Sequence, residues 1–184
     1  MRIIAGTARS RQIKAPEGRD TRPTLDRVRE NVFNILQHRI RGAKTLDLFA
    51  GSGAMSLEAV SRGAEQAVLV DKDRAAIAAQ KANITALRFE SQTRVMHMDW
   101  QMAVRQLQAA GERFDFVFLD PPYAMRDMTG VMQALVPLLA PGATILLEHE
   151  ARVMPSTAEG FEMVDSRKYG YCGVSFFQRV GEEA

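Results

Sequence analysis

The sequence has a single cysteine, Cys172, among its 184 residues, so no disulfide can form within the chain. A chain without disulfides fits a reducing compartment, and we expect the protein to work in the cytoplasm. No apolar run approaches the roughly 18–20 residues that a membrane-spanning helix requires. Residues 1–20 are basic and lack the apolar segment and cleavage site of a secretory signal. The three histidines, His38, His97 and His149, are scattered without the spacing of metal ligands, so we expect no metal site.

The charge is small in total but unevenly distributed along the chain. The net charge is +2, yet residues 1–45 hold 11 Lys and Arg against 4 Asp and Glu, a local charge of +7. A basic segment beside an acidic remainder favours an anionic partner such as nucleic acid, although a solvated basic tail would look the same. The length fits one domain with a proper core and leaves little room for a second.

The first 44 residues predict a small basic extension and one helix. Residues 2–5 and 12–14 form a hairpin around Gly6, and a loop rich in Gly, Pro and charge follows from residue 16 to residue 23. A helix begins at Thr24, a good N-cap residue, and its apolar residues recur at helical spacing. Arg27, Arg29 and Glu30 fall outside that apolar stripe.

From residue 44 onward the pattern alternates between strand and helix. The predicted strands are Thr45–Phe49, Ala67–Val70, Thr93–Met98, Phe114–Leu119, Thr144–Leu147, Phe161–Lys168 and Val174–Arg179. The predicted helices are Ala54–Arg62, Arg74–Leu87 with Asp73 as N-cap, Trp100–Ala109, and Thr129–Leu139, which stops near Pro141-Gly142. Repeated βαβ units predict an α/β fold, a doubly wound and mostly parallel seven-stranded sheet. Ligands then gather at the carboxyl ends of the strands.

A glycine turn, Gly51-Ser52-Gly53, follows the first of these strands and opens a helix. Its backbone can approach a ligand closely, and the helix N-terminus adds free N–H donors. The dinucleotide fingerprint fails because Ser56 stands at its third glycine position. Asp47, four residues before Gly51, would repel a pyrophosphate but attract a cation, and S-adenosylmethionine carries both a sulfonium and an ammonium.

Two more acids stand at the ends of the next two strands. Asp71 lies 20 residues after Gly51, where a carboxylate would accept hydrogen bonds from ribose hydroxyls. Asp99 could accept from the adenine amino group, with Lys72 or Trp100 beside the ring. The alternative is that these acids are only helix caps.

The strand Phe114–Leu119 is apolar on both faces and ends in Asp120-Pro121-Pro122-Tyr123. An exocyclic amine on a nucleobase is a poor nucleophile because its lone pair is delocalised into the ring. Asp120 and the Pro121 carbonyl can accept from its two N–H groups, and the prolines hold these acceptors in place. Tyr123 can stack on the base. The tip therefore predicts methyl transfer to an exocyclic amine, although an ordinary strand-to-loop turn uses similar residues.

Nearly the whole chain resembles the small-subunit ribosomal RNA guanine-N2 methyltransferases that use S-adenosylmethionine, the RsmD family. The most specific matches are residues 2–6 and 21–34; residues 47–53 and 120–123 match too but are shared with other amino-methyltransferases. The resemblance implies a Rossmann-like class I methyltransferase in which the segment 22–24 closes over the cofactor. It also implies that the basic hairpin contacts RNA phosphates. Residues 1–23 would be an extension of a single domain whose core is 24–184.

The resemblance and the patterns together give one set of predicted site residues. The catalytic residues are Asp120, Pro121, Pro122 and Tyr123. The cofactor residues are Arg22, Thr24, Asp47, Phe49, Gly51, Ser52, Gly53, Asp71, Lys72, Asp99 and Trp100. The RNA-binding residues are Arg2, Arg9, Arg11, Lys14, Arg27 and Lys168. The expected partner is ribosomal RNA in an assembling small subunit, bound by a monomer.

Other functions share parts of this pattern. An adenine-N6 or cytosine-N4 methyltransferase would use the same tip but would need room for a target-recognition domain. Protein glutamine methyltransferases usually carry Asn where this chain has Asp120. A non-catalytic RNA-binding protein on the same fold predicts erosion of Asp120 or of the glycine turn, and neither is eroded. A nicotinamide oxidoreductase is disfavoured by Asp47 and Ser56.

Overall fold

The computed structural model describes residues 1–16, 23–122, 124–125 and 127–181, and for residues 23–25 the backbone alone. Its centre is a seven-stranded sheet with the order β3-β2-β1-β4-β5-β7-β6. The strands are β1 (Lys44–Asp47), β2 (Gln66–Asp71), β3 (Thr93–His97), β4 (Phe114–Leu119), β5 (Leu139–Glu150), β6 (Phe161–Tyr169) and β7 (Cys172–Arg179). Strands β1 to β5 pair in parallel, while β7 runs antiparallel to β5 and to β6. The predicted α/β sheet, mostly parallel, is confirmed.

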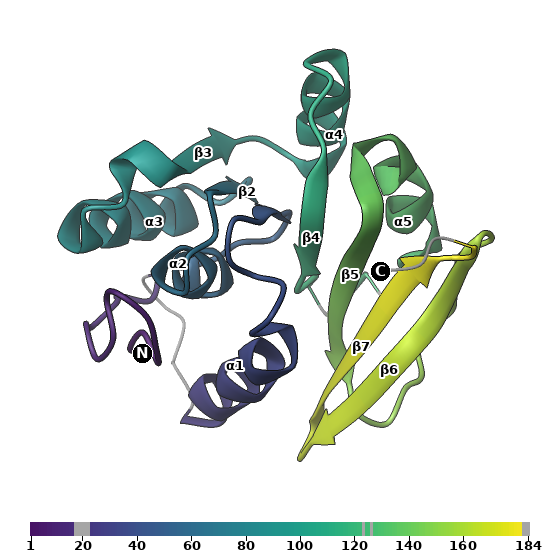
Figure 1. Cartoon of the computed structure of the whole chain (residues 1–184), viewed down its shortest axis with the longest axis horizontal. Coiled ribbons are helices and arrows are strands. Elements are labelled where there is room, and N and C mark those ends of the chain that lie inside the picture. Colours follow the sequence, from purple (N-terminus) through teal and green to yellow (C-terminus); the bar gives the residue numbers. More distant parts are fainter. Residues whose placement is uncertain (17–22, 123, 126, 182–184) are drawn as a thin grey trace.

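Helices cover both faces of this sheet (Figure 1). They are α1 (Pro23–Leu36), α2 (Ala54–Ser61), α3 (Arg74–Leu87), α4 (Trp100–Ala109) and α5 (Thr129–Leu135), with short 3-10 turns at Glu90–Gln92 and Val136–Leu138. Helices α4 and α5 share one apolar core with β1, β2, β4 and β5, whereas α1, α2 and α3 pack on the opposite face. No helix among the described residues is long and apolar enough to cross a membrane.

The switch point of the sheet lies between β1 and β4. Strands β1, β2 and β3 progress toward one edge, and the chain then crosses to the other side of β1 to form β4. At such a point the loops after the two central strands diverge and leave a crevice at their carboxyl ends. Asp47 is the last residue of β1 and Asp120 follows β4, so the crevice is bounded by the two acids that the sequence singled out.

Some predicted boundaries are wrong. Helix α1 already includes Pro23, so Thr24 lies inside the helix rather than at its start. The helix predicted to run to Leu139 ends as α5 at Leu135, and β5 starts at Leu139 rather than at Thr144. The strand therefore passes through Pro141-Gly142, with a register shift against β4 and a positive φ of 69° at Gly142. Arg39, just after α1, donates to the Gly142 carbonyl and to Thr144 Oγ1. These hydrogen bonds stabilise the irregular part of β5.

The N-terminal segment forms the predicted hairpin, with an antiparallel bridge between Arg2 and Gln12. It is fastened to α2 through Glu58, whose carboxylate is fully buried and accepts from the backbone N–H groups of Ile4 (2.8 Å) and Ala5 (3.0 Å). Arg62 Nε donates to the same carboxylate at 2.7 Å, and Arg29 Nε lies 3.5 Å from it. Arg29 is therefore buried although it lies outside the apolar stripe, because a buried carboxylate from another helix requires a cation.

Candidate active site

Two cavities open at the carboxyl edge of the sheet. The first, here the glycine-turn cavity, measures about 210 Å³ and is lined by residues of β1, the glycine turn and α1. The second, here the tip cavity, measures about 440 Å³ and lies between the Asp120 tip and the segment after β5. Asp120 and Glu148 line both. A ligand in one cavity would therefore meet a ligand in the other beside these two carboxyl groups.

The glycine turn is held in place by side chains from neighbouring elements. Asp71 Oδ2 accepts from the Gly51 N–H at 2.9 Å, and Gln80 donates to the Gly51 carbonyl at 3.0 Å. Asn83 donates to the Ser52 carbonyl at 3.0 Å. Gly53 has a φ of 81°, and a Cβ there would lie 2.7 Å from a methyl carbon of Leu69, so the position requires glycine. The turn is thus fixed before any ligand arrives.

Asp47 lies under this turn and is 2% exposed. Ser56 Oγ donates to its carboxylate at 3.2 Å. Burial is the main reason that the pKa of Asp47 rises from 3.8 to about 7; the Ser56 hydrogen bond opposes this shift and the charge of Asp71 adds to it. No cationic side chain among the described residues pairs with Asp47. A positively charged ligand would therefore strongly stabilise the ionised form of this buried carboxyl group.

The predicted cofactor residues whose side chains the structure describes fall into two groups. Asp47, Phe49, Gly51 and Ser52 line the glycine-turn cavity, and Gly53 is the next residue of the same turn. The others, Asp71, Lys72, Asp99 and Trp100, stand at the ends of β2 and β3 outside the lining of either cavity.

The two acids of this second group already serve the protein itself. Asp99 caps α4 by accepting from the Met102 N–H at 2.9 Å, and Asp71 accepts from Gly51 and Asp73. Each carboxylate oxygen has a second lone pair, so capping does not prevent contact with a ligand. Arg22 and the side chain of Thr24 lie outside the described residues.

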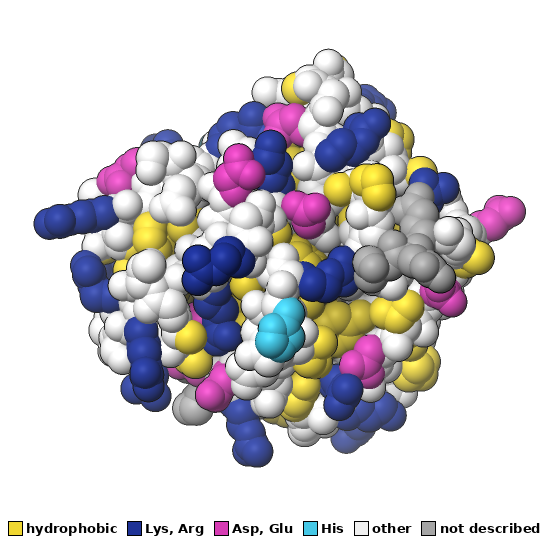
Figure 2. All heavy atoms as spheres, viewed as in Figure 1, with side chains coloured by type: hydrophobic (Ala, Val, Ile, Leu, Met, Phe, Trp, Pro, Cys, Tyr) yellow, Lys and Arg dark blue, Asp and Glu magenta, His cyan; other side chains and the backbone are white. Residues whose placement is uncertain are grey.

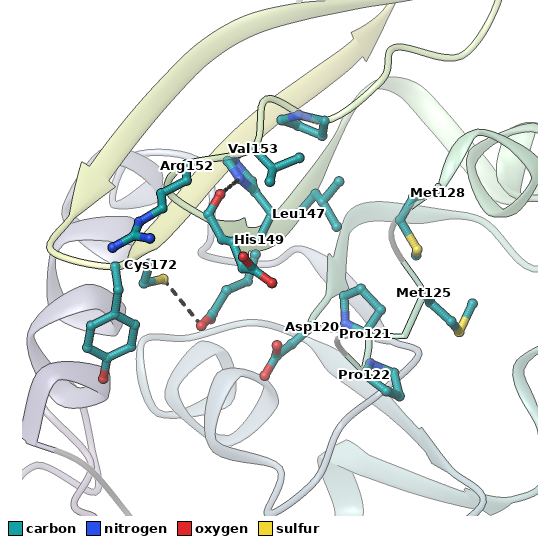
Figure 3. A pocket seen from close by; sticks show the side chains of 14 residues that line it. Asp120, Pro121, Pro122, Met125, Met128, Leu147, His149, Arg152, Val153 and Cys172 are labelled. Atoms are coloured by element: carbon teal, nitrogen blue, oxygen red, sulfur yellow. Dashed lines mark hydrogen bonds between the residues drawn. The ribbon is translucent and has the colours of Figure 1, made fainter.

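The tip after β4 forms one wall of the tip cavity. Asp120 is exposed at the end of a strand whose residues are buried on both faces, as predicted. The Pro122 carbonyl accepts from the Met125 N–H at 2.8 Å, which closes the turn. Figure 3 shows Asp120, Pro121 and Pro122 on one side of the cavity and Arg152, His149 and Cys172 across from them. Tyr123 lies outside the described residues.

The opposite wall of the tip cavity was missed by the sequence analysis. Glu148, near the end of β5, accepts from the Cys172 thiol at 3.2 Å, and burial raises the pKa of both groups. His149 contacts the Glu150 carbonyl and Ser175 Oγ, both at 2.9 Å. The only local signal was that Glu148 directly follows the predicted apolar strand Thr144–Leu147, as Asp120 follows Phe114–Leu119.

The residues predicted to bind RNA are exposed, which suits a surface role: Arg2, Arg9, Arg11, Lys14, Arg27 and Lys168. Three of them, Arg9, Arg11 and Lys14, belong to the N-terminal hairpin and are called the hairpin cations below. Arg11 also donates to the Ala86 carbonyl at the end of α3. Figure 2 shows Lys and Arg side chains over the part of the face where Figure 1 places the N-terminal segment and α3. Within the described ranges, no three His, Cys, Asp or Glu side chains gather as a metal site would require.

Comparison with known proteins agrees with this architecture. The family described as "Conserved hypothetical protein 95" matches residues 1–178. The protein named ribosomal RNA small subunit methyltransferase D in Escherichia coli K12 is 34% identical over 189 residues, which cover 99% of this chain and 91% of that one. Its namesake in Haemophilus influenzae is 32% identical over 181 residues, covering 97% and 93%.

A solved structure shares the same fold along the whole chain. The structure of yhhF from Escherichia coli superposes with a TM-score of 0.85 at 32% identity, covering 97% of both chains. Since the family match and the similarity to full-length relatives both run from end to end, the chain belongs to the family of conserved hypothetical protein 95, the RsmD family.

Proposed function

We propose that the protein transfers a methyl group from S-adenosyl-L-methionine to the 2-amino group of a guanine in small-subunit ribosomal RNA. The observation that carries the proposal is the pair of cavities that meet at Asp120, one under a rigid glycine turn and one under a proline-fixed tip. Relatives named ribosomal RNA small subunit methyltransferase D support the substrate class.

The glycine-turn cavity has the chemistry that S-adenosylmethionine requires. Asp47 offers a buried carboxylate to a cationic ligand, and the glycine turn offers backbone groups at close approach. Asp71 and Asp99, at the ends of the neighbouring strands, are proposed to hold the ribose and adenine, with Phe49, Lys72 and Trp100 near the ring system. The bound cofactor supplies the electrophilic methyl group.

The tip cavity would hold the guanine and prepare its amine. Asp120 and the Pro121 carbonyl accept from the two N–H groups, so that the nitrogen lone pair is directed toward the neighbouring cavity. Tyr123 is proposed to stack on the base and keep it in line. Because Asp120 is exposed, the proton that the nitrogen loses after transfer can pass through this carboxylate to water.

RNA would be held mainly through its phosphates. The hairpin cations, with Arg2 and Arg27, provide exposed positive charge on the N-terminal segment and α1, and Lys168 lies near the end of β6. Phosphate contacts fix the position of an RNA without reading its sequence. We propose that the protein acts as a monomer on an assembling small subunit in the cytoplasm.

The role of Asp120 is tested by replacing it with Ala and measuring two quantities separately. Single-turnover transfer is expected to fall by about 100-fold or more, since a hydrogen-bond acceptor of the amine is lost. The Kd for S-adenosylmethionine is expected to change less than about threefold, because Asp120 is exposed and Asp47 remains. Asp165→Ala, on the terminal hairpin, is the matched control. An equal loss of cofactor affinity and transfer would refute this division of roles.

A further inference from the structure

Glu148 lies beside Asp120 at the carboxyl edge of the sheet. Strands β4 and β5 are parallel, and their register pairs Leu119 with Leu147. The next residue along the chain in each case is an acid: Asp120 directly follows the end of β4, and Glu148 lies in the last three residues of the neighbouring β5. Both line the tip cavity and the glycine-turn cavity. The junction at which methyl transfer is proposed therefore has two acids, of which the proposed function uses only Asp120.

Glu148 is oriented by a thiol. Cys172, the first residue of β7, is 4% exposed and donates to Glu148 Oε1 at 3.2 Å, as the dashed line from Cys172 marks in Figure 3. Burial and the adjacent carboxyl groups raise the pKa of Cys172, so it stays a thiol and a donor. Among the described residues no other hydrogen bond reaches the Glu148 side chain. One oxygen is thus held by the thiol and the second remains for a ligand.

The ring atom beside the amine differs between the bases that could enter. In guanine, the carbon that bears the 2-amino group is next to N1, which carries a hydrogen and donates. In adenine and cytosine, the nitrogen next to the amine-bearing carbon, N1 or N3, has a lone pair and accepts. Two adjacent carboxylates can accept from the amine and the N1–H of guanine together. With adenine or cytosine, the second carboxylate would face a lone pair, which is repulsive.

We propose that Glu148 accepts a hydrogen bond from the guanine N1–H and thereby selects guanine over adenine and cytosine. The proposal rests on the function proposed above, because it takes the tip cavity as the site of the target base. The pKa of Glu148 is raised, mainly by burial, and the Cys172 hydrogen bond and the charge of His149 oppose this rise. Glu148 is then a specificity-determining residue, and Cys172 positions it.

The test uses two base analogues that keep the 2-amino group and lack the N1 hydrogen. Both analogues also lack the guanine O6 oxygen, so the Glu148→Gln variant described below is needed to assign a loss of rate to N1. Once the labelled guanosine has been located, small subunits are rebuilt with RNA that carries 2-aminopurine or 2,6-diaminopurine at that position. Transfer by the unmodified protein is expected to fall by about 10- to 100-fold on either analogue, the usual effect of losing a hydrogen bond to a charged group. Equal rates on guanine and on both analogues would overturn the proposal.

The Glu148→Gln variant adds an independent measurement. If its amide oxygen accepts from Cys172, its NH2 group faces the base and suits an accepting N1. The variant is expected to lose transfer to guanine by about tenfold and to discriminate against the analogues by less than about threefold. Glu162→Gln, on the exposed part of β6, is expected to discriminate as the unmodified protein does. Undiminished discrimination by Glu148→Gln would refute the assignment.

The outcomes separate this inference from the proposed function. One outcome is that the label appears in N2-methylguanosine while the protein acts equally well on guanine and on the analogues. This outcome would refute the role of Glu148 and leave the proposed function intact. Label in an adenine or cytosine derivative would remove both. If the Glu148→Gln protein does not fold, the unmodified protein still provides a test. Equal rates on guanine and on both analogues would overturn the inference, and a loss of about 10- to 100-fold on both analogues would support it.

Discussion

The proposed pairing of Asp47 with the cofactor predicts that cofactor binding depends on pH. The Asp47 carboxyl group is 2% exposed, and burial is the main cause that raises its pKa from 3.8 to about 7. A cationic cofactor prefers the ionised form of this group. Below pH 7, the free protein carries a proton on Asp47, and that proton must leave before the ammonium of S-adenosylmethionine can pair with the carboxylate.

The size of the effect follows from the pKa. The ionised fraction of the free protein falls about tenfold for each pH unit below 7, so the Kd for the cofactor should rise by about tenfold per unit. Between pH 8 and pH 5 the Kd should therefore rise by about 100-fold. The stability of the free protein changes with pH in the same window. Since the folded pKa lies above the unfolded value of 3.8, the contribution of Asp47 is complete below about pH 4 and is lost as the pH rises through 7.

Calorimetric titration measures both consequences. The Kd is followed from pH 5 to pH 8, and experiments in two buffers of different ionisation enthalpy at pH 6 should show close to one proton released per cofactor bound. The Asp47→Asn variant should bind weakly at pH 8 and lose this pH dependence, since it has no proton to release. A Kd for the unmodified protein that stays constant from pH 5 to pH 8 would refute the reasoning.

Three further predictions concern the parts around the site. Neutralising the three hairpin cations together should lower the association constant for RNA by about tenfold or more in a filter-binding assay. The slope of the logarithm of that constant against the logarithm of salt concentration should become shallower by about 2. An unchanged slope would exclude the hairpin from the RNA interface. Gly53→Ala should lower the free energy of unfolding more than Gly42→Ala does. Both glycines have a positive φ, but only at position 53 would the added Cβ lie 2.7 Å from the Leu69 side chain. Equal losses in urea denaturation would contradict this. Glu58→Gln should lower the free energy of unfolding by about 3 kcal/mol in the same assay, because it breaks buried ion pairs. The exposed Glu65→Gln should lower it by less than about 0.5 kcal/mol. An equally small loss for Glu58→Gln would show that the buried ion pairs do not stabilise the hairpin.

The elements with strong local signals were predictable from sequence. Helix α3 runs from Arg74 to Leu87 as predicted, because Asp73 is a strong cap and does accept from the Ala75 N–H at 2.9 Å. Strand β4 also has its predicted bounds, since a short apolar run without polar alternation suits a strand buried on both faces. These features are encoded within a few residues and do not depend on distant partners.

The start of β5 could not be predicted because it depends on tertiary contacts. Pro141 and Gly142 are typical of a loop, yet they lie within β5. Pairing of Leu139 with Phe114 and the hydrogen bond from Arg39 to Gly142 stabilise them there. Neither partner is close in sequence, so local propensity gave the wrong boundary.

The candidate site divides in the same way. Asp47, Gly51 and Asp120 were predicted because each stands at or shortly after the end of an apolar strand, and parallel strands bring such ends to one edge. Glu148 and Cys172 were not assigned to the site, because only the antiparallel pairing of β5 with β7 brings the thiol against the carboxyl group. Sequence spacing of 24 residues carries no sign of that contact.

The most direct test of the central claim is to identify the methylated nucleoside. The protein is incubated with methyl-labelled S-adenosylmethionine and small ribosomal subunits that lack the modification, and the RNA is digested and its nucleosides separated. Label in N2-methylguanosine, absent with Asp120→Ala, is the predicted result. Label in an adenine or cytosine derivative, or equal labelling by the Asp120→Ala protein, would contradict the account.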